Sequence, residues 1–230
     1  MNNALKRLEP QFGPPADLAI LDAAAVKLGF EVPGPLRELY ERGDGAKLPS
    51  VPGEILTLET ATRIVQYKPL AHTVYFPWPF FEVQGYASDP VCLIVRGPGT
   101  GYVIQNCHDG SDRMIAPSME AFFDWLATGS AVGEFFDEEG PSPLFAGAPD
   151  ASTLDVVTAM MSSAPNATDP YEAESLYDLV GSIVDDETYV DLFTREQIPI
   201  RNYFACILSR ARRMPPELRM RLDEMYALLI

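Results

Sequence analysis

Residues 16–45 constrain the fold more than any other part of the chain, because they specify two helices and the kink between them. Leucines and alanines at helical spacing predict the first helix, and Gly29 follows it where a left-handed residue ends a helix. The residue before Pro33 is expected to be extended. Pro35 suits the first turn of a second helix, which the Gly-Asp-Gly sequence of residues 43–45 ends. The segment therefore predicts helix, kink and helix in that order.

Further along the chain, residues 80–117 alternate short apolar runs with glycine-rich turns. The runs VCLIVR and YVIQNC flank GPGTG, which is a hairpin pattern. Ser118 then suits the cap of a helix in which Phe122 and Phe123 share a face with other apolar residues. We therefore expect a hairpin followed by a helix that lays an aromatic face on the sheet.

The rings of residues 75–81 lie between prolines. Proline cannot donate to a strand ladder, so this segment is not expected to form a regular central strand throughout. Two interpretations stay open for its aromatic side chains. They cover the hydrophobic core, or some of them line a surface groove that binds a partner.

The two helices of residues 16–45, the hairpin and the aromatic helix follow one another in an order that resembles the signature of the SUKH superfamily. This superfamily groups bacterial toxin-immunity proteins with fungal cell-wall synthesis regulators. The resemblance covers about residues 16–127 and includes PVCLIVR, YVIQNCHDGSDRMIAP and SMEAFFDWL. The chain departs from the family in residues 71–81, which are richer in proline and aromatic residues. The resemblance implies an α+β fold with a mixed, mainly antiparallel sheet of about five or six strands packed with helices. It also implies binding rather than chemistry.

After a stretch dense in Pro, Gly, Ala and Ser, the pattern changes to helices only. We expect residues 1–137 to form the SUKH-like domain, residues 138–152 a linker, and residues 153–230 an all-helical C-terminal extension. Ser152 and Asp155 resemble a capping box at the start of this extension. The periodicity leaves open whether the extension packs on the first domain or forms a second one.

The charge of the chain disfavours one class of partner. It has 33 acidic and 17 basic residues, a formal net charge of −16. Such a charge repels a phosphate backbone, so no nucleic-acid partner is expected, whereas it speeds encounter with a basic protein. A solvated acidic surface without a partner is the alternative. No apolar run approaches the roughly 20 residues that span a bilayer, and the N-terminus lacks a signal-peptide core, so we expect a cytoplasmic protein with no membrane partner.

Cys107, His108 and Asp109 place a thiol, an imidazole and a carboxylate side by side. Successive strand residues point to opposite faces, so a Cys-His dyad is disfavoured here, and the family resemblance makes this sequence a turn at a strand end. The three cysteines show no zinc-binding spacing, and the nearby acids lack the register of a calcium loop. We therefore expect a protein that is not an enzyme, with no cofactor, no metal and no catalytic residue. A hydrolase using Cys107 or His108 is an alternative.

The resemblance makes an immunity protein the leading hypothesis. Such a protein would neutralise a cognate basic toxin domain, a nuclease or a deaminase, by occluding its active site. Acidic side chains and aromatic anchors would form the contacts. A regulatory scaffold that binds several cytoplasmic partners, like the fungal relatives, is the second hypothesis. The candidate contact residues are Asp44, Trp78, Glu82, Tyr86, Asp89, Asp109 and Asp112.

Overall fold

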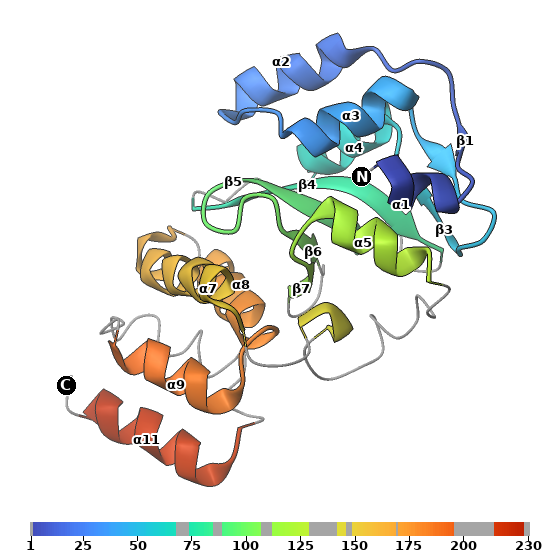
Figure 1. The fold of residues 1–230 in the computed structure, drawn as a ribbon. Coiled ribbons are helices and arrows are strands. Elements are labelled where there is room, and N and C mark those ends of the chain that lie inside the picture. The colour runs from blue at the N-terminus through green and yellow to red at the C-terminus, as the bar shows by residue number, and fades with distance from the viewer. Residues whose placement is uncertain are drawn as a thin grey trace.

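The fold combines one antiparallel sheet with two layers of helices (Figure 1). This computed structural model describes residues 2–67, 74–84, 89–106, 112–128, 142–145, 149–168, 170–195 and 214–227. Seven strands lie in the sheet in sequence order, and every neighbouring pair is antiparallel. The predicted α+β class is confirmed, with a sheet slightly wider than expected. The strands are β1 (Gln11–Phe12), β2 (Ala46–Lys47), β3 (Gly53–Ile55), β4 (Phe76–Val83), β5 (Val91–Arg96), β6 (Val103–Gln105) and β7 (Arg113–Ala116).

The helices fall into two groups along the chain. The N-terminal group is α1 (Asn2–Arg7), α2 (Leu18–Leu28), α3 (Gly34–Arg42), α4 (Leu58–Tyr67) and α5 (Met119–Leu126). The C-terminal group is the short η1 (Pro143–Phe145) and η2 (Ala164–Asn166) with α7 (Ala151–Ser163), α8 (Pro170–Gly181), α9 (Asp186–Arg195) and α11 (Pro216–Ala227). In the part of the chain that the structure describes, no helix combines the length and apolarity needed to cross a bilayer.

The predicted kink between α2 and α3 is present. Asp17 caps α2 through its side chain, which accepts a hydrogen bond from the Ala19 N–H at 3.1 Å. Gly29 ends the helix in the left-handed conformation, with φ of 69°. Pro33 is extended and caps α3. Residues within this segment therefore define both ends of α2 and the start of α3.

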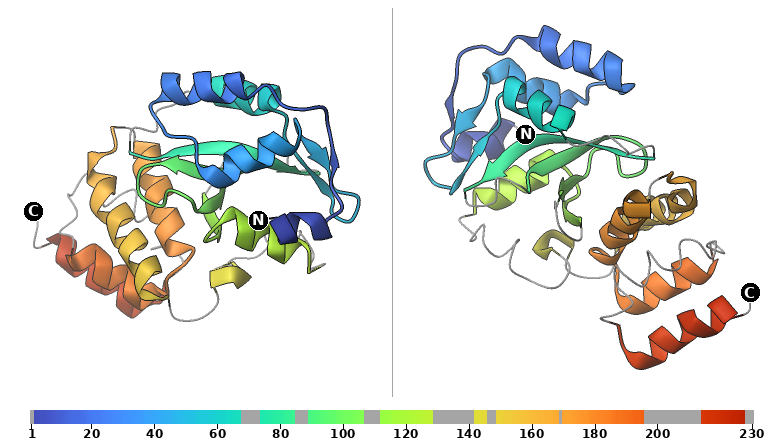
Figure 2. Two further views of the ribbon diagram at one scale, coloured as in Figure 1. Left: turned by 45° about the horizontal axis from the view of Figure 1, so that its top comes forward. Right: turned by 180° about the vertical axis from the view of Figure 1, so that it is seen from behind.

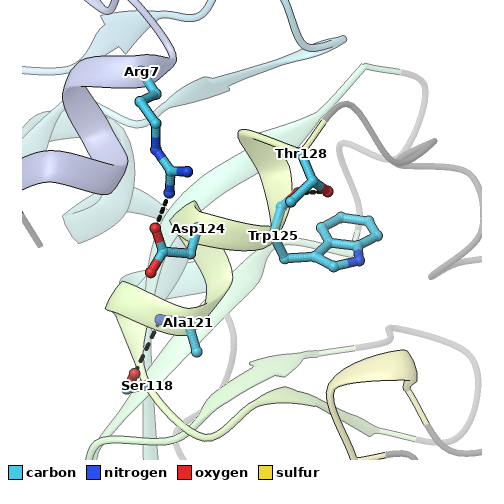
Figure 3. Close-up of polar contacts among 6 residues, drawn as sticks. All are labelled: Arg7, Ser118, Ala121, Asp124, Trp125 and Thr128. Atoms are coloured by element: carbon cyan, nitrogen blue, oxygen red, sulfur yellow. Dashed lines mark hydrogen bonds and ion pairs between the residues drawn. The ribbon is translucent and has the colours of Figure 1, made fainter.

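The end of α5 and its start are both held by side chains (Figure 3). Ser118 caps the helix as predicted, because its hydroxyl oxygen accepts from the Ala121 N–H at 3.1 Å. At the other end, the Thr128 hydroxyl donates to the Trp125 carbonyl at 2.7 Å. Arg7 of α1 pairs with Asp124, which ties the first helix of the chain to α5.

The N-terminal helices bury one face of the sheet in a first core. The ring of Phe80 meets that of Phe122 edge-on, with centroids 5.7 Å apart, and Phe81 meets Phe122 in the same way at 5.4 Å. Phe30 stacks on Phe76. The aromatic side chains of β4 are at most 1% exposed, so they cover the core, and the alternative of a surface groove is wrong.

β4 is a central strand in spite of its two prolines. It lies between β3 and β5, and Pro77 and Pro79 are buried within it. Register shifts occur between Phe76 and Pro77 and between Pro79 and Phe81. The strand is thus irregular at its prolines, as expected, but it is longer and more central than the sequence indicated.

The C-terminal helices bury the other face of the sheet in a second core, which answers the question that periodicity left open. Alternation along β5 sends Leu93 and Val95 into the first core and Cys92 and Ile94 into the second. Side chains of α7, α8, α9 and α11 complete the second core. Figure 2 shows α7 and α8 beside the sheet, with α9 and α11 farther out. Residues 91–95 of β5 are all apolar because both faces of the strand are covered.

One predicted cap in this layer is wrong. Asp150, rather than Ser152, caps α7, because its carboxylate accepts from the Thr153 N–H at 2.8 Å. The helix therefore begins at Ala151, inside the segment predicted as a linker. The division into two domains remains a prediction.

Candidate protein-binding surface

Strand register gathers several candidate residues at one end of the sheet. Val91 of β5 lies opposite Gln105 of β6, and Gln105 lies opposite Arg113 of β7. The connections from β4 to β5 and from β6 to β7 therefore open at the same end. Glu82, Asp89 and Asp112 belong to this end. The candidates Tyr86 and Asp109 lie in the two connections, outside the described residues, as do Cys107 and His108.

Two candidates are buried, which corrects their assignment as contact residues. Trp78 is 0% exposed and lies in the first core beside Phe30. Asp112 is 2% exposed, and its carboxylate accepts hydrogen bonds from the Tyr75 hydroxyl at 2.9 Å and from the Asn106 side-chain amide at 3.0 Å. A partner cannot reach either side chain. Both are instead required by the packing that surrounds them.

The hydrogen bonds of Asp112 belong to a polar cluster beneath the C-terminal helices. Burial raises the pKa of the Tyr75 hydroxyl well above its usual value, and the negative charge of Asp112 raises it further. Glu172 of α8 is also buried, and its carboxylate accepts from the main-chain N–H of Val74 at 2.7 Å. The sequence analysis missed this cluster, because its members come from distant segments and share no motif.

Asp44 has a structural role in the described structure. It is half-buried, and its carboxylate accepts from the Leu58 N–H, the first N–H of α4, at 2.7 Å. Burial raises the pKa of the neighbouring Tyr40 hydroxyl, and the charge of Asp44 adds to the rise. Asp44 lies beyond Ile55, at the other end of β3 from the hairpin connections.

Glu82 lies directly opposite Glu54 in the pairing of β4 with β3. Their neighbours Ile55 and Phe81 face the first core, so alternation places both glutamates on the opposite face of the sheet. Glu54 is exposed and Glu82 is half-buried. No described residue of β1–β3 belongs to the second core. Gln11, Lys47 and Glu54 are exposed, so the described residues of the C-terminal helices leave this part of the face uncovered.

A row of polar side chains crosses this uncovered area. Lys47 lies opposite Gln11 on one side and opposite Glu54 on the other, and Glu82 follows. We name these four residues the open sheet face. Glu54 and Glu82 repel each other, because like charges directly opposite one another destabilise a strand pair. Glu54 was not predicted as a contact residue. With only three residues, β3 is too short for an alternating pattern to indicate a strand.

A pocket of about 310 Å³ lies at the other end of the strands, between the first turns of α3 and α5. It opens beside the turn that joins β5 to β6, on the side of the first core. No sequence pattern pointed to it, because its walls come from four separate segments. The lining residues are Pro33, Pro35, Glu38, Leu93, Gly101, Pro117, Ser118, Met119 and Glu120.

The described residues contain no group of three or more His, Cys, Asp and Glu side chains placed to hold a metal ion. Cys92 is a buried thiol in the second core, and its Sγ donates to the Pro90 carbonyl at 3.6 Å. The architecture is that of an α+β protein whose antiparallel sheet lies between two helical layers, and the described helices leave Glu54 and the half-buried Glu82 on an uncovered part of one face. Comparisons with models of known protein families, with curated protein sequences and with solved structures found no match.

Proposed function

We propose that this chain is a protein-binding module that captures a basic protein through its open sheet face. The single observation that carries the proposal is the direct opposition of Glu54 and Glu82 on a part of the sheet that the described helices do not cover. A lysine or arginine placed between the two carboxylates would turn their repulsion into two attractions. Asp89, half-buried before β5, adds a third carboxylate at the same end of the sheet.

The net charge of the chain supports the same proposal at long range. A formal charge of −16 attracts a basic partner before contact and raises the association rate. The open sheet face then supplies a local site where two carboxylates meet across the strands. Lys47 lies on only one side of Glu54, so Glu82 faces another acid across the strands.

The resemblance of residues 16–127 to the SUKH superfamily supplies the biological setting of the proposal. In that setting the partner is the basic domain of a cognate toxin, a nuclease or a deaminase, and the module acts as an immunity protein by occluding the toxin's active site. A regulatory scaffold is the alternative. It would bind several proteins weakly, whereas an immunity protein binds one partner tightly, with an association rate that falls steeply as ionic strength rises.

A hydrolase that uses Cys107 or His108 is a further alternative, and no described residue bears on it. Replacement of both residues by alanine tests it. The hydrolase hypothesis expects any turnover by the purified chain to disappear in the double variant.

The decisive test is co-expression with the protein encoded by the neighbouring reading frame, where an immunity protein should rescue growth from a toxin. The double variant Glu54→Gln/Glu82→Gln should lose rescue. The matched control is Glu217→Gln/Glu224→Gln, which removes the same charge from exposed positions of α11. Equal rescue by both double variants would show that the open sheet face is not the contact surface. Absence of a toxin gene beside this one, together with binding to several unrelated proteins, would favour the scaffold.

A further inference from the structure

We infer that the outer face of α2 binds a second copy of this chain, with the two α2 helices antiparallel across a twofold axis. This interface goes beyond the function proposed above. α2 covers the first core, whereas the open sheet face lies on the opposite side of the sheet. Figure 1 shows α2 at the outside of the molecule, far from α11. A copy bound at α2 therefore leaves the open sheet face free.

α2 is apolar on both of its faces, which is unusual for a helix at the surface. The inner face buries Leu21, Ala24 and Ala25. On the outer face, Val26 is 84% exposed and Ile20 is 41% exposed. Four large apolar side chains are exposed in the part of the chain that the structure describes, and two of them lie on this one helix. A helix that is apolar all round is normally covered on every side, so we expect a partner here.

The outer face consists of Ala19, Ile20, Ala23, Val26 and Lys27, all of them exposed. Spacings of three and four positions separate these residues from Ala23, so they lie along one side of the helix. The short side chain of Ala23, at the middle, lets another helix approach closely. With Ala23 on the twofold axis, each contact occurs twice. Val26 packs on Ala19 of the second copy, and Ile20 packs on the methylene stem of its Lys27.

The charges near this face favour a second copy as the occupant. A chain with a net charge of −16 repels its own copy, so two copies can meet only where acids are few or paired. Asp22 lies beside the outer face, and it is ion-paired with Arg37 of α3. Lys27 is exposed, and no described carboxylate forms an ion pair with it. The outer face therefore offers a cation in a strongly acidic protein.

Asp17 supplies the opposite charge for Lys27 across the axis. It is exposed and accepts from the Ala19 N–H, and a carboxylate can accept further donors. A turn of about 100° per residue places Asp17 and Lys27 on the same side of Ala23. In the antiparallel pair, Lys27 then lies about 3 Å along the axis from Asp17 of the second copy, which a lysine side chain spans. Two ion pairs result, so the face is complementary to itself.

Sedimentation equilibrium of the full chain over a range of concentrations tests this interface. One helix pair is smaller than a standard protein interface, so we expect a weak dimer that is populated at about 1 mM. Ala23→Glu places two like charges on the axis and should leave the chain monomeric. Lys27→Glu should weaken the dimer about tenfold, because two attractions become repulsions. The matched control is Ala159→Glu, at an exposed position of α7, which should dimerise as the wild type does.

Crosslinking tests which residues meet. Ala23→Cys should form a disulfide-linked dimer under mild oxidation, because the two thiols meet on the axis. Ala159→Cys should crosslink no more than the wild type. A wild-type chain that stays monomeric at about 1 mM, a dimer that survives in Ala23→Glu, or equal crosslinking of the two cysteine variants would overturn the inference. Growth rescue depends on the open sheet face, which all these variants retain, so failure of rescue and failure of dimerisation are separate results.

Discussion

Glu172 of α8 accepts a hydrogen bond from the main-chain N–H of Val74, two residues before β4, across 98 positions of sequence. The carboxylate is 2% exposed, so this bond joins the C-terminal helices to the sheet inside the protein. Replacement by alanine removes the acceptor from the partly buried Val74 N–H and from the buried Tyr75 N–H, which bonds to the same oxygen at 3.4 Å. Glu172→Ala should therefore lower the free energy of unfolding by about 1–3 kcal/mol in urea denaturation.

The control for this variant is Glu187→Ala, an exposed acid in the first turn of α9. A surface change of this kind should alter the free energy of unfolding by no more than about 0.5 kcal/mol. Equal effects of the two substitutions would mean that the bond between Glu172 and Val74 contributes nothing to stability.

Removal of the C-terminal helices should expose the second-core face of the sheet. A chain that stops after residue 149 would uncover Cys92, Ile94, Ile104 and Met114, all now at most 2% exposed. An apolar sheet face of this kind promotes association, so the shortened chain should aggregate and bind a hydrophobic dye. Size-exclusion chromatography and dye fluorescence measure this. A monomeric shortened chain that unfolds cooperatively would contradict the role assigned to these helices.

Stability should fall in alkaline solution because the pKa of Tyr75 is raised in the folded state. Above about pH 10 the unfolded chain loses the phenolic proton while the folded chain keeps it, so deprotonation favours unfolding. The contribution is complete below the unfolded pKa and is lost as pH rises toward the folded one. Tyr75→Phe should flatten the decline between about pH 9 and pH 11 in urea denaturation.

The same variant should be less stable near neutral pH by about 1–3 kcal/mol, because Asp112 loses the hydroxyl that donates to it. Tyr102→Phe is the control, since Tyr102 is only half-buried and stacks on Phe145. In Tyr102→Phe, the free energy of unfolding should fall with rising pH as steeply as in the wild type. An unchanged slope in Tyr75→Phe would show that another group causes the decline.

Gly29 should be the more sensitive of two glycines in the kinked segment. Its φ of 69° is left-handed, so Gly29→Ala should cost about 1–2 kcal/mol in free energy of unfolding. Gly34 begins α3, and a Cβ added there meets nothing within 4 Å. Gly34→Ala should be neutral or slightly stabilising. Thermal or urea denaturation compares the two, and a reversed order would contradict the assigned helix end.

Glu82→Gln should stabilise the isolated chain while it weakens capture of a basic partner. The substitution removes the repulsion from Glu54, which we expect to be worth about 0.2–1 kcal/mol at low salt. The gain should vanish as added salt screens the charges. Glu59→Gln, on α4, should show no such salt-dependent gain. Loss of stability in Glu82→Gln at low salt would indicate that Glu82 has a structural partner.

Much of the local structure could be predicted because it depends on residues close together in the chain. Gly29 and Ser118 end and begin their helices through contacts within a few positions. The hairpin of VCLIVR and YVIQNC needed only a turn between two apolar runs. The aromatic face of α5 likewise followed from helical spacing, and Phe122 does meet β4.

The candidate surface could not be predicted in the same way, because it depends on which strands pair and what covers them. Trp78 and Asp112 looked available in sequence, yet strand register and the packing of distant helices bury both. Glu54 gained its importance only by lying opposite Glu82. Helix ends and turns were thus determined by the sequence itself, through short-range hydrogen bonds and backbone preferences. Burial and charge opposition were decided by tertiary structure, since they arise from contacts between residues far apart in the chain.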